Sequence, residues 1–525
     1  MITDTDILIV GAGPAGLLAA IRAARLGARV IVAEKNKLTG RKLRLCGKGR
    51  CNITNIAEKQ SFIRQYGPQG KFLHSAFSRF FQREIIALLE DAGVPTKEER
   101  GGRVFPVSDR ADDVADALER VARDAGARIM TGCKVEGLII SQGGRAEDAL
   151  QGTLERTSKS ASKRELKGAL DGTLKDAIKG ALVYDAWDRS EIRAKAVIIA
   201  TGGLSYPLTG STGDGYGWAR EAGHTIIDLK PGLVPLESPD KWVRELSGLT
   251  LKNVKATLWE ATDAPNDAGN ITDAGVSNDA GNITDAGVPN DAGNITDTGV
   301  PNDAGNITDA GAPNDAGALI NDGASGGENV SSARRDRRIA SYQGETLFAH
   351  FGLTGPIILS LSRHYREDPG KTAYVTIDLK PALSFEILDK RLQRDFLTYQ
   401  KKNLSNAMVD LLPKALINPL LEQCGLDPRA PVSELTRAQR LEICRVLKAL
   451  KVNITGARPL DEAIVTAGGV SLAEVEPKTM ASRLVPGLYF AGELLDIDGS
   501  TGGYNLQIAF STGALAGESA ASDNH

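Results

Sequence analysis

Three glycines near the amino terminus have the type and spacing of a dinucleotide site. Gly11, Gly13 and Gly16 lie in the sequence DILIVGAGPAG at residues 6–16. In such a site the first glycine makes a tight turn, the second lets the backbone approach a pyrophosphate, and the third lets a helix pack closely on a strand. The spacing therefore predicts that this turn binds the diphosphate of a nucleotide.

The elements that must position this turn are also present in the sequence. An apolar strand at 7–10 precedes it, an alanine-rich helix follows to about residue 26, and a second strand covers 29–33. The first N–H groups of the helix face the phosphates, where the helix dipole favours negative charge. Glu34 ends the second strand, where an acid can accept both hydroxyls of a ribose. The cofactor-binding residues expected in this βαβ unit are Gly11, Gly13, Pro14, Ala15, Gly16, Glu34 and Lys35.

Three further glycine-rich segments favour FAD over a shorter nicotinamide dinucleotide. They are ATGG at 200–203, STGDGY at 211–216 and AGELLDIDGSTGGYNL at 491–506, although each alone is also compatible with an ordinary turn. Such loops gather beyond the carboxyl ends of strands, where ligands of open α/β sheets bind. We expect Glu493 to accept ribityl hydroxyls, and the helix beginning at 503–506 to face the flavin carbonyls. The residues assigned here are Thr201, Gly202, Gly203, Gly492, Glu493, Gly502, Gly503, Tyr504, Asn505 and Leu506.

The bulk composition is typical of a soluble globular protein of two or three domains. The chain has 525 residues, of which 42% are hydrophobic and 25% are charged. No apolar run approaches the ~20 residues of a membrane span, and the apolar amino terminus lacks a basic leader, so we expect no membrane segment. Five cysteines in so long a chain do not form a disulfide framework, so we expect a cytoplasmic location.

Two low-complexity segments interrupt the chain. Twelve-residue units of the type NDAGNITDAGVP begin at residues 266, 278, 290 and 302, and a truncated copy begins at 314. Each unit has too few bulky apolar groups to offset the entropy cost of ordering, so we expect a disordered insertion over 262–333. A calcium-binding β-solenoid is the alternative. The segment 143–190 is expected to be a second insertion, at the tip of a hairpin.

Charge is unevenly distributed along the chain. Residues 262–328 contain twelve acidic residues and no Lys or Arg, and without them the formal charge of the rest rises from −3 to +9. Five basic residues lie between 41 and 50. We expect Arg41 and Lys42 to neutralise the pyrophosphate, and the alternative is contact with the phosphates of an RNA substrate.

The order of elements predicts an α/β fold in which both chain ends build one Rossmann-like FAD-binding domain around an inserted module. The expected limits are 1–203 and 456–525 for the two parts of the FAD-binding domain. A β-rich subdomain is expected at 204–384. A helical subdomain is expected at 385–455, because leucines recur there at helical spacing.

Several motifs resemble those of the BaiN/RdsA (YhiN-type) family of NAD(P)/FAD-dependent oxidoreductases. They are GRKLRLCGKGRCNITN at 40–55, the segment 200–216, TLFAHFGLTGP at 346–356, TAGGV at 466–470 and the segment 491–513. The resemblance covers the whole chain except the two low-complexity segments. It implies an FAD-binding Rossmann-like domain with an inserted module that has a β-rich and a helical part.

The resemblance also implies an activity. Members of this family are implicated in reducing carbon–carbon double bonds, in steroid-like enones or in a uracil ring of ribosomal RNA. The expected reductant is NADH or NADPH, and the flavin then passes a hydride to an unsaturated small molecule or to rRNA. We assign Cys51 and Asn52 to the flavin face and Val135 to cofactor binding. His350 is a candidate proton donor, although a histidine between two phenylalanines is more often a packed residue.

Cys46 and Lys48 depart from the family pattern, which has serine and glycine at these positions. Cys46 and Cys51 therefore form a C-x4-C pair, so a flavoprotein dithiol/disulfide oxidoreductase is one alternative. Another is a flavin-binding protein whose main role is to bind RNA or a protein partner. We expect no metal site, because cysteines and histidines lack the spacing of metal ligands.

Overall fold

The computed structural model describes residues 2–141, 177–185, 188–261, 336–368 and 371–523. The twelve-residue repeats lie outside the described residues, so the disordered insertion and the β-solenoid both remain predictions. Within the described ranges, no helix combines the length and apolar character needed to cross a membrane.

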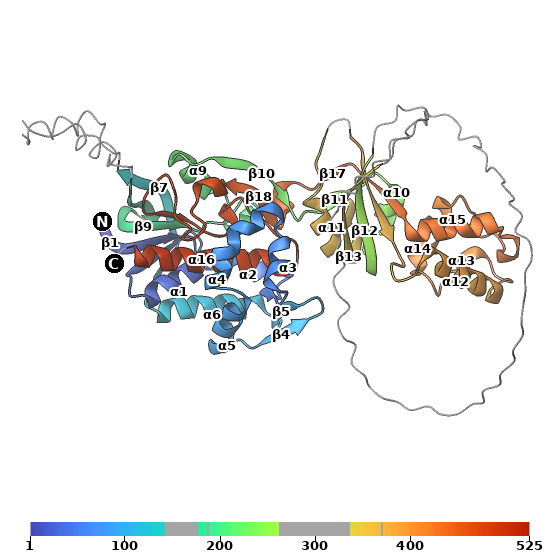
Figure 1. The fold of residues 1–525 in the computed structure, drawn as a ribbon, viewed down its shortest axis with the longest axis horizontal. Helices are drawn as coiled ribbons and strands as arrows, with labels where there is room; N and C mark the ends of the chain where they lie inside the picture. The colour runs from blue at the N-terminus through green and yellow to red at the C-terminus, as the bar shows by residue number, and fades with distance from the viewer. Residues whose placement is uncertain (1, 142–176, 186–187, 262–335, 369–370, 524–525) are drawn as a thin grey trace, which may run out of the picture. The chain divides into compact units, whose positions relative to one another are not determined.

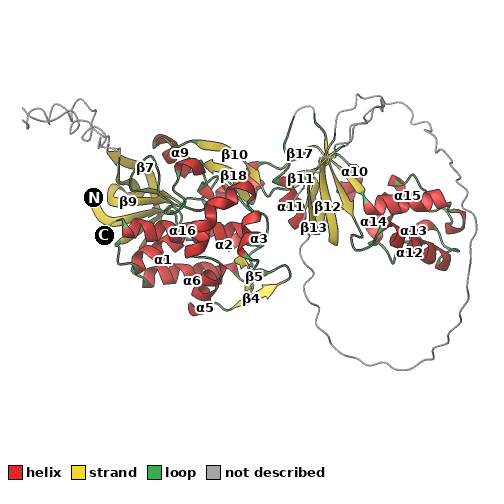
Figure 2. Ribbon diagram, viewed as in Figure 1, coloured by secondary structure: helices red, strands yellow, loops and turns green. Residues whose placement is uncertain are grey.

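A largely parallel sheet forms the first part of the molecule (Figures 1 and 2). Its strands are ordered β6–β2–β1–β9–β8–β7, and β19 pairs with β9. β6, β2, β1, β9 and β19 are parallel, whereas β8 is antiparallel to β7 and β9. Both faces of β1 are covered, which explains its continuous apolar sequence. The bounds are β1 (Ile2–Val10), β2 (Val30–Glu34), β6 (Arg128–Thr131), β7 (Cys133–Ser141), β8 (Ala177–Asp185), β9 (Asp188–Ile199) and β19 (Leu488–Phe490).

The low-complexity segment predicted at 143–190 is too long. Residues 177–185 form β8, and β9 begins at Asp188. Ile178, Ala181 and Val183 are buried, and Lys179 and Gly180 between them conceal this strand pattern in the sequence. Residues 142–176 lie outside the described residues.

Two helices from opposite ends of the chain pack together beside this sheet. They are α1 (Pro14–Arg25) and α16 (Tyr504–Ser522). A Cβ atom on Gly513 would lie 2.1 Å from the carbonyl oxygen of Ala15, and one on Gly517 would lie 2.3 Å from that of Ala19. Glycine is therefore required at both positions, and the two chain ends share one hydrophobic core. Figure 1 shows both termini at the same end of this sheet.

Several shorter elements between residues 41 and 124 pack against α1 and α16. They include a three-stranded sheet ordered β3–β5–β4. Helix α6 is strongly amphipathic, and its apolar side joins the first core. The bounds are α2 (Arg41–Leu45), β3 (Thr54–Asn55), α3 (Lys59–Arg64), a 3₁₀ segment (Gly67–Leu73), α4 (His74–Arg79), α5 (Gln82–Asp91), β4 (Thr96–Glu99), β5 (Arg103–Pro106) and α6 (Ala111–Asp124).

The middle of the chain contains a second, antiparallel sheet with its own core. The strand order is β16–β15–β12–β13–β14–β11–β17. Val254, Ala256 and Leu258 alternate with polar residues along β12 and are buried in the second core. The bounds are β11 (Leu236–Glu237), β12 (Thr250–Glu260), β13 (Arg337–Ala349), β14 (Gly352–Thr354), β15 (Ala373–Asp378), β16 (Leu450–Ile454) and β17 (Gly456–Ala457).

Helices complete the second core, and a two-stranded sheet of β10 (Ile226–Gly232) and β18 (Val465–Val470) joins the middle of the chain to its last part. Leucines at helical spacing form most of the buried sides of α12 and α14, as predicted, and the buried side of α15 is formed by Ile443, Cys444, Val446 and Leu447. The helix bounds are α10 (Lys241–Glu245), α11 (Pro356–Ser362), α12 (Phe385–Thr398), α13 (Leu404–Ala407), α14 (Lys414–Gln423) and α15 (Arg437–Lys448).

Two segments lie close to the expected domain limits. Tyr216 and Trp218 of α9 (Asp214–Glu221) pack in the first core, although they follow residue 203. Residues 450–457 form β16 and β17 of the second sheet instead of continuing the helices. The subdomain limits themselves remain a prediction.

Candidate functional site

The glycine turn after β1 has the backbone geometry of a dinucleotide loop. Gly11 has a φ of 101°, and a Cβ atom there would lie 2.7 Å from the carbonyl oxygen of Ala200. A Cβ atom on Gly16 would lie 1.9 Å from the carbonyl oxygen of Gly11, so α1 packs on the turn at a distance only glycine allows. Gly13, at the N-cap of α1, has no atom within 4 Å of its Cβ position. Pro14 occupies the first helical position, where no N–H donor is needed.

The buried carboxylate of Glu34 fixes the other side of the turn. Its Oε2 accepts a hydrogen bond from the backbone N–H of Ala12 at 2.8 Å. Its Oε1 accepts from the backbone N–H and the side-chain amide of Asn36, at 2.8 and 2.7 Å. A carboxylate has about four acceptor positions. Glu34 therefore retains capacity for a ribose hydroxyl while it holds the turn.

Lys35 and Arg41 extend this region with positive charge. Lys35 Nζ donates to Asp214 Oδ2 at 2.7 Å and to the hydroxyl of Thr212, which connects the end of β2 to the start of α9. Arg41 is exposed, and its guanidinium donates to Asn36 Oδ1 at 2.9 Å. Both cations therefore lie next to Glu34, at the carboxyl end of β2.

Four segments far apart in the sequence meet at the carboxylate of Glu493. Lys42 Nζ donates to its Oε2 at 2.6 Å. The hydroxyl of Ser205 and the backbone N–H of Thr466 donate to its Oε1, at 2.7 and 2.8 Å. Lys42 also donates to Ser205 Oγ at 2.6 Å. These residues, called the Glu493 cluster below, join α2, the turn after β9, strand β18 and the loop after β19.

The turn at 201–203 lies between the first glycine turn and the Glu493 cluster. The N–H of Ala200 donates to the carbonyl of Val10 at 2.9 Å, so this turn follows β9 directly beside the end of β1. A Cβ atom on Gly203 would lie 2.4 Å from Thr466 Oγ1. Gly202 has a φ of 74°, which favours glycine, and Thr201 is half-buried beside it.

The loop after β19 brings the carboxyl-terminal motif against the first part of the chain. A Cβ atom on Gly492 would lie 2.9 Å from the Cβ of Ala15. Gly503 is the N-cap of α16, with a φ of 95°, and its Cβ position lies 2.5 Å from the backbone of Thr54. Asn505 Oδ1 accepts from the N–H of Gly499 at 2.8 Å, and its amide donates to the carbonyl of Gly499 at 2.9 Å. The asparagine therefore braces the loop that precedes the helix.

Tyr504 and Leu506 begin α16, and Gly502 precedes its N-cap. The Tyr504 carbonyl accepts from the hydroxyl of Tyr66 at 3.1 Å, and its ring contacts Phe62 edge to face, with centroids 4.6 Å apart. Leu506 packs on the first core. Gly502 has a φ of 124°, and its carbonyl accepts from the amide of Asn55 at 3.3 Å.

Cys51 and Asn52 lie beside the amino terminus of α16. The amide of Asn52 accepts from the N–H of Gly503 and donates to the carbonyl of Thr54, both at 3.1 Å. Cys51 is fully buried with a φ of 60°, and its N–H donates to the carbonyl of Cys46 at 2.9 Å. In the described part of the chain, no disulfide joins any of the cysteines. Burial raises the pKa of the Cys51 thiol well above its ordinary value, and burial also raises that of Cys46.

Two of the predicted site residues lie on other elements. His350 is exposed in the turn between β13 and β14 of the second sheet, where its ring lies edge-on to Phe351, with centroids 4.9 Å apart. Val135 is buried in β7 and pairs with Val183 of β8. These surroundings add nothing to the roles predicted for the two residues.

The arrangement fits a dinucleotide with a long second half. The open position at Gly13 lies at the amino terminus of a twelve-residue helix, where backbone N–H groups favour a phosphate. Glu34, bonded to Ala12, and Glu493, which follows Gly492 beside Ala15, mark two acceptor positions for hydroxyl groups near this helix end. The amino terminus of α16 supplies further N–H donors. Together these residues suit FAD. In the described part of the chain, no group of three or more His, Cys, Asp or Glu is arranged to hold a metal ion.

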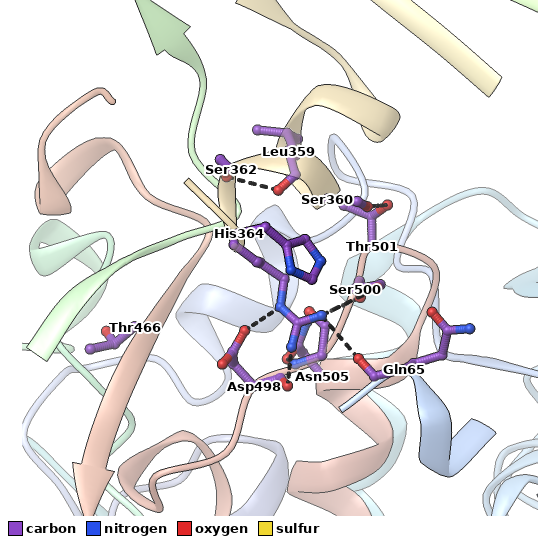
Figure 3. A network of polar contacts seen from close by, with 12 residues as sticks. Gln65, Leu359, Ser360, Ser362, His364, Thr466, Asp498, Ser500, Thr501 and Asn505 are labelled. Atoms are coloured by element: carbon purple, nitrogen blue, oxygen red, sulfur yellow. Dashed lines mark hydrogen bonds and ion pairs between the residues drawn. The ribbon is translucent and has the colours of Figure 1, made fainter. Parts of the chain in front are cut away.

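Sequence reasoning missed four polar residues around these loops. Ser205 and Thr466 complete the Glu493 cluster. Burial and the nearby carboxylate of Asp498 raise the pKa of Asp496 to about 6. Arg363 lies after α11 and donates hydrogen bonds to Asp498 and Ser500, which are labelled in the polar network of Figure 3. Ser205, Thr466 and Asp496 lie within motifs that resemble those of the family, whereas Arg363 lies outside them.

A family model described as HI0933-like protein Rossmann domain matches residues 5–161 and 144–519. The chain belongs to this family. It is 29% identical over 521 residues to a 3-dehydro-bile acid delta(4,6)-reductase of Clostridium scindens, covering 98% of each chain. It is 25% identical over 507 residues to a ribosomal RNA dihydrouridine synthase of Escherichia coli, covering 97% of this chain and 96% of that one. A 3-ketosteroid-delta4-(5alpha)-dehydrogenase from Rhodococcus jostii aligns over 99% of this chain, with a TM-score of 0.45 at 14% identity.

These comparisons confirm three predictions from the sequence. The resemblance drawn from the motifs at 40–55, 346–356 and 491–513 is confirmed by the family match and by the two relatives. The α/β fold with a Rossmann-like domain is confirmed. The general class of enzyme, an oxidoreductase, is confirmed too.

Proposed function

We propose that this chain binds one FAD between its two ends and uses it to reduce a carbon–carbon double bond conjugated to a carbonyl group. The observation that carries the proposal is the Glu493 cluster. It draws the carboxyl-terminal loop, the turn after β9 and Lys42 to the same place, next to the open Gly13 turn. A mononucleotide has one sugar part, so it would not need two separate carboxylates, Glu34 and Glu493, as acceptors for its hydroxyl groups.

Each part of the site would bind a different part of FAD. The N–H groups at the start of α1, with the positive charge of Arg41 and Lys35, would hold the pyrophosphate. Glu34 would accept the ribose hydroxyls of the adenosine half, and Glu493 would accept ribityl hydroxyls. The N–H groups at the start of α16 would face the flavin carbonyls, and Cys51 and Asn52 would line the same region. When bound, FAD supplies hydride transfer from a nicotinamide to the substrate alkene.

The residues of the chain would orient the substrate and supply the proton that completes the reduction. The predicted donor is His350 or a water molecule. The predicted reductant is NADH or NADPH. The sequence contains one GxGxxG turn, at 11–16, so the nicotinamide would bind only transiently, beside the flavin.

Two substrate classes share the required chemistry. An enone has an alkene next to a carbonyl, and so does the uracil ring of uridine. The names of the two relatives point to one class each, a bile acid and ribosomal RNA. We therefore propose an unsaturated small molecule or a uridine in rRNA as the substrate. The RNA-binding alternative from the sequence requires affinity for RNA without turnover.

The dithiol alternative is disfavoured by the surroundings of the cysteines. Disulfide exchange requires a thiolate, which a lowered pKa provides. Burial instead raises the pKa of both Cys46 and Cys51. The variants Cys46→Ser and Cys51→Ser should therefore keep the activity that reduces the alkene. If the protein were a dithiol enzyme, each of the two variants would lose its reductase activity.

One experiment tests the function and separates the alternatives. The purified protein is loaded with FAD, reduced anaerobically with NADH or NADPH, and mixed with an enone, a uridine-containing rRNA fragment or an oxidised dithiol. Reoxidation of the flavin by the enone or the rRNA, with formation of the saturated product, is the expected result. Reoxidation by the disulfide alone would support the dithiol enzyme. Tight rRNA binding without reoxidation would support the RNA-binding protein, and deleting 262–333 would then show whether the repeats carry that binding.

A further inference from the structure

Arg363 connects the middle of the chain to the loop that precedes α16. It follows α11 directly, and its side chain is only 13% exposed. Its Nε donates to Asp498 Oδ2 at 2.5 Å, and Nη2 donates to the Asp498 carbonyl at 2.8 Å. Its Nη1 donates to the carbonyl of Gln65 at 3.0 Å and to Ser500 Oγ at 3.3 Å. One guanidinium thus connects the start of the glycine loop to Gln65, the C-cap residue of α3.

The hydrogen bonds of Arg363 indicate a role in positioning rather than in catalysis. All three nitrogens of the guanidinium donate to oxygens of the protein itself. Such a planar fork fixes its acceptors in direction as well as in distance, which a lysine ammonium cannot do. Arg363 is therefore suited to hold the backbone of residues 498–500 in one conformation.

A second contact holds the same loop from the same helix. Thr501 Oγ1 lies 3.2 Å from Ser360 Oγ and donates to the carbonyl of Pro356 at 3.3 Å. Figure 3 shows Ser360 next to Thr501, with Ser500 below Thr501 and Asp498 at the lower left of the network. The start of α11 and the residue that follows its end therefore both contact the loop 498–501.

The family motif at 346–356 forms the hairpin that leads into α11. Thr346 is fully buried in β13, and its hydroxyl donates to the carbonyl of Thr354 at 3.3 Å across the β13–β14 hairpin. Gly355, with a φ of 96°, turns the chain into α11, and its Cβ position lies 3.0 Å from the N–H nitrogen of Leu347. The motif thus shapes the hairpin that starts α11, and so sets where Arg363 lies.

We propose that Arg363 is a positioning residue for the flavin site: from the inserted module, it fixes the loop 498–503 so that the amino terminus of α16 is ordered to receive the flavin. The inference rests on the proposed function for the identity of the ligand. It assigns a role in the flavin site to the inserted module, through α11 and Arg363. Gly502 and Gly503 have little conformational preference of their own, so the order of this loop must come from its contacts.

The test compares Arg363→Gln, Arg363→Lys and Thr501→Val with a matched control, Arg366→Gln. Arg366 is exposed and donates to the carbonyls of residues 363 and 365. The first readout needs no flavin: amide hydrogen exchange of residues 498–503 in the apoprotein. The second is the dissociation constant for FAD, together with the visible spectrum of the bound flavin. Thermal unfolding of each variant reports whether the fold is retained.

We expect both Arg363 variants to raise exchange in 498–503 and to weaken FAD binding by about 10-fold or more, as for loss of charge-assisted hydrogen bonds. The lysine variant should not restore binding, because it keeps the charge but loses the fork. Thr501→Val should show a smaller change in the same direction, and Arg366→Gln none. Wild-type exchange and wild-type FAD affinity in Arg363→Lys would overturn the proposal, even if Arg363→Gln fails to fold. If wild-type protein binds no FAD, the proposed function fails, and the exchange measurement still decides whether Arg363 orders the loop.

Discussion

The two glycine turns of the proposed flavin site are held in different ways. The turn at 11–16 is held by backbone packing, with Gly16 against the carbonyl of Gly11 and Gly11 against that of Ala200 on the neighbouring strand. The loop at 498–503 is held by side chains from other segments, above all Arg363, which is 135 residues before Asp498 in the sequence. The first turn is a local property of a βαβ unit, while the second depends on an inserted module.

This difference has consequences for how the site can change. A turn fixed by backbone contacts tolerates almost no added atom. Only glycine fits at its packed positions, so the turn can be recognised from the sequence. A loop fixed by side chains can be loosened by one substitution without disturbing the sheet. The substitutions below test this difference between the two turns, and those with the greatest predicted effect come first.

Gly16→Val should prevent stable folding. Its Cβ atom would overlap the carbonyl oxygen of Gly11, which belongs to the backbone and cannot move aside. We expect a loss of unfolding free energy above about 4 kcal/mol, measured by thermal or urea unfolding. The control is Gly217→Ala in α9, where no atom lies within 4 Å of the Cβ position. Equal stability of the two variants would show that the turn is not held by this contact.

Gly13→Val should abolish FAD binding and leave the fold intact. The Cβ position of Gly13 is open in the protein alone, and its backbone conformation suits any residue. The added side chain would fill the space expected to hold the pyrophosphate, so we expect FAD affinity to fall by about 100-fold or more. Equilibrium dialysis with FAD, together with a melting curve, measures both properties. Unchanged affinity would place the phosphate elsewhere.

Lys42→Met should weaken FAD binding by about 10-fold. The variant removes the cation from the Glu493 cluster and leaves that carboxylate with Ser205 and Thr466 as donors. The matched control is Lys37→Met, because Lys37 is exposed and, like Lys42, follows β2 in the sequence. FAD titration of both variants measures the difference. If the two variants bind FAD equally well, the Glu493 cluster has no role in the site.

Asp496→Asn should change how stability depends on pH in the apoprotein. Burial and Asp498 raise the pKa of Asp496 to about 6, above the value of ~3.9 expected in the unfolded chain. Between these values the folded state holds a proton that the unfolded state releases, so this group makes the wild type lose stability as pH rises from about 4 to about 6. Asparagine cannot ionise, so the variant should gain stability relative to wild type over that window. Urea unfolding across pH 4.5–7.5 measures this, and parallel curves for the two proteins would show that Asp496 titrates normally.

Arg22→Ala should have the smallest effect. Arg22 forms an ion pair with Glu518, which connects α1 to α16, but its side chain is one-third exposed. We expect a loss of about 0.5–1 kcal/mol in unfolding free energy and no change in FAD affinity. A double-mutant cycle with Glu518→Gln isolates the contribution of the pair. A coupling energy far above 1 kcal/mol would mean that the two chain ends depend on this pair more than on their glycine contacts.

The local part of the site could be predicted from the sequence. Gly11, Gly13, Gly16 and Glu34 lie within one βαβ unit, so their spacing alone specifies the turn that the structure contains. The same is true of α6 and of the helices at 385–448, whose apolar residues recur at helical spacing.

The long-range part could not be predicted from the sequence. Lys42 and Glu493 are 451 residues apart, and no periodicity indicates that a lysine in one loop will meet a carboxylate in another. Arg363 carries no motif of its own. Strand β8 lies within the low-complexity insertion predicted at 143–190. Its sequence has no strong local pattern, because its burial depends on pairing with β7 and β9.

The most direct test of the account is a titration of the apoprotein with FAD, carried out on wild type, Gly13→Val and Lys42→Met. These two substitutions change the pyrophosphate turn and the Glu493 cluster, whose contributions come from opposite ends of the chain. The account predicts one FAD bound per wild-type chain and weaker binding in both variants, each of which stays folded. A wild-type protein that binds no FAD, or two variants that bind it as well as the wild type, would contradict a single flavin site shared by both chain ends.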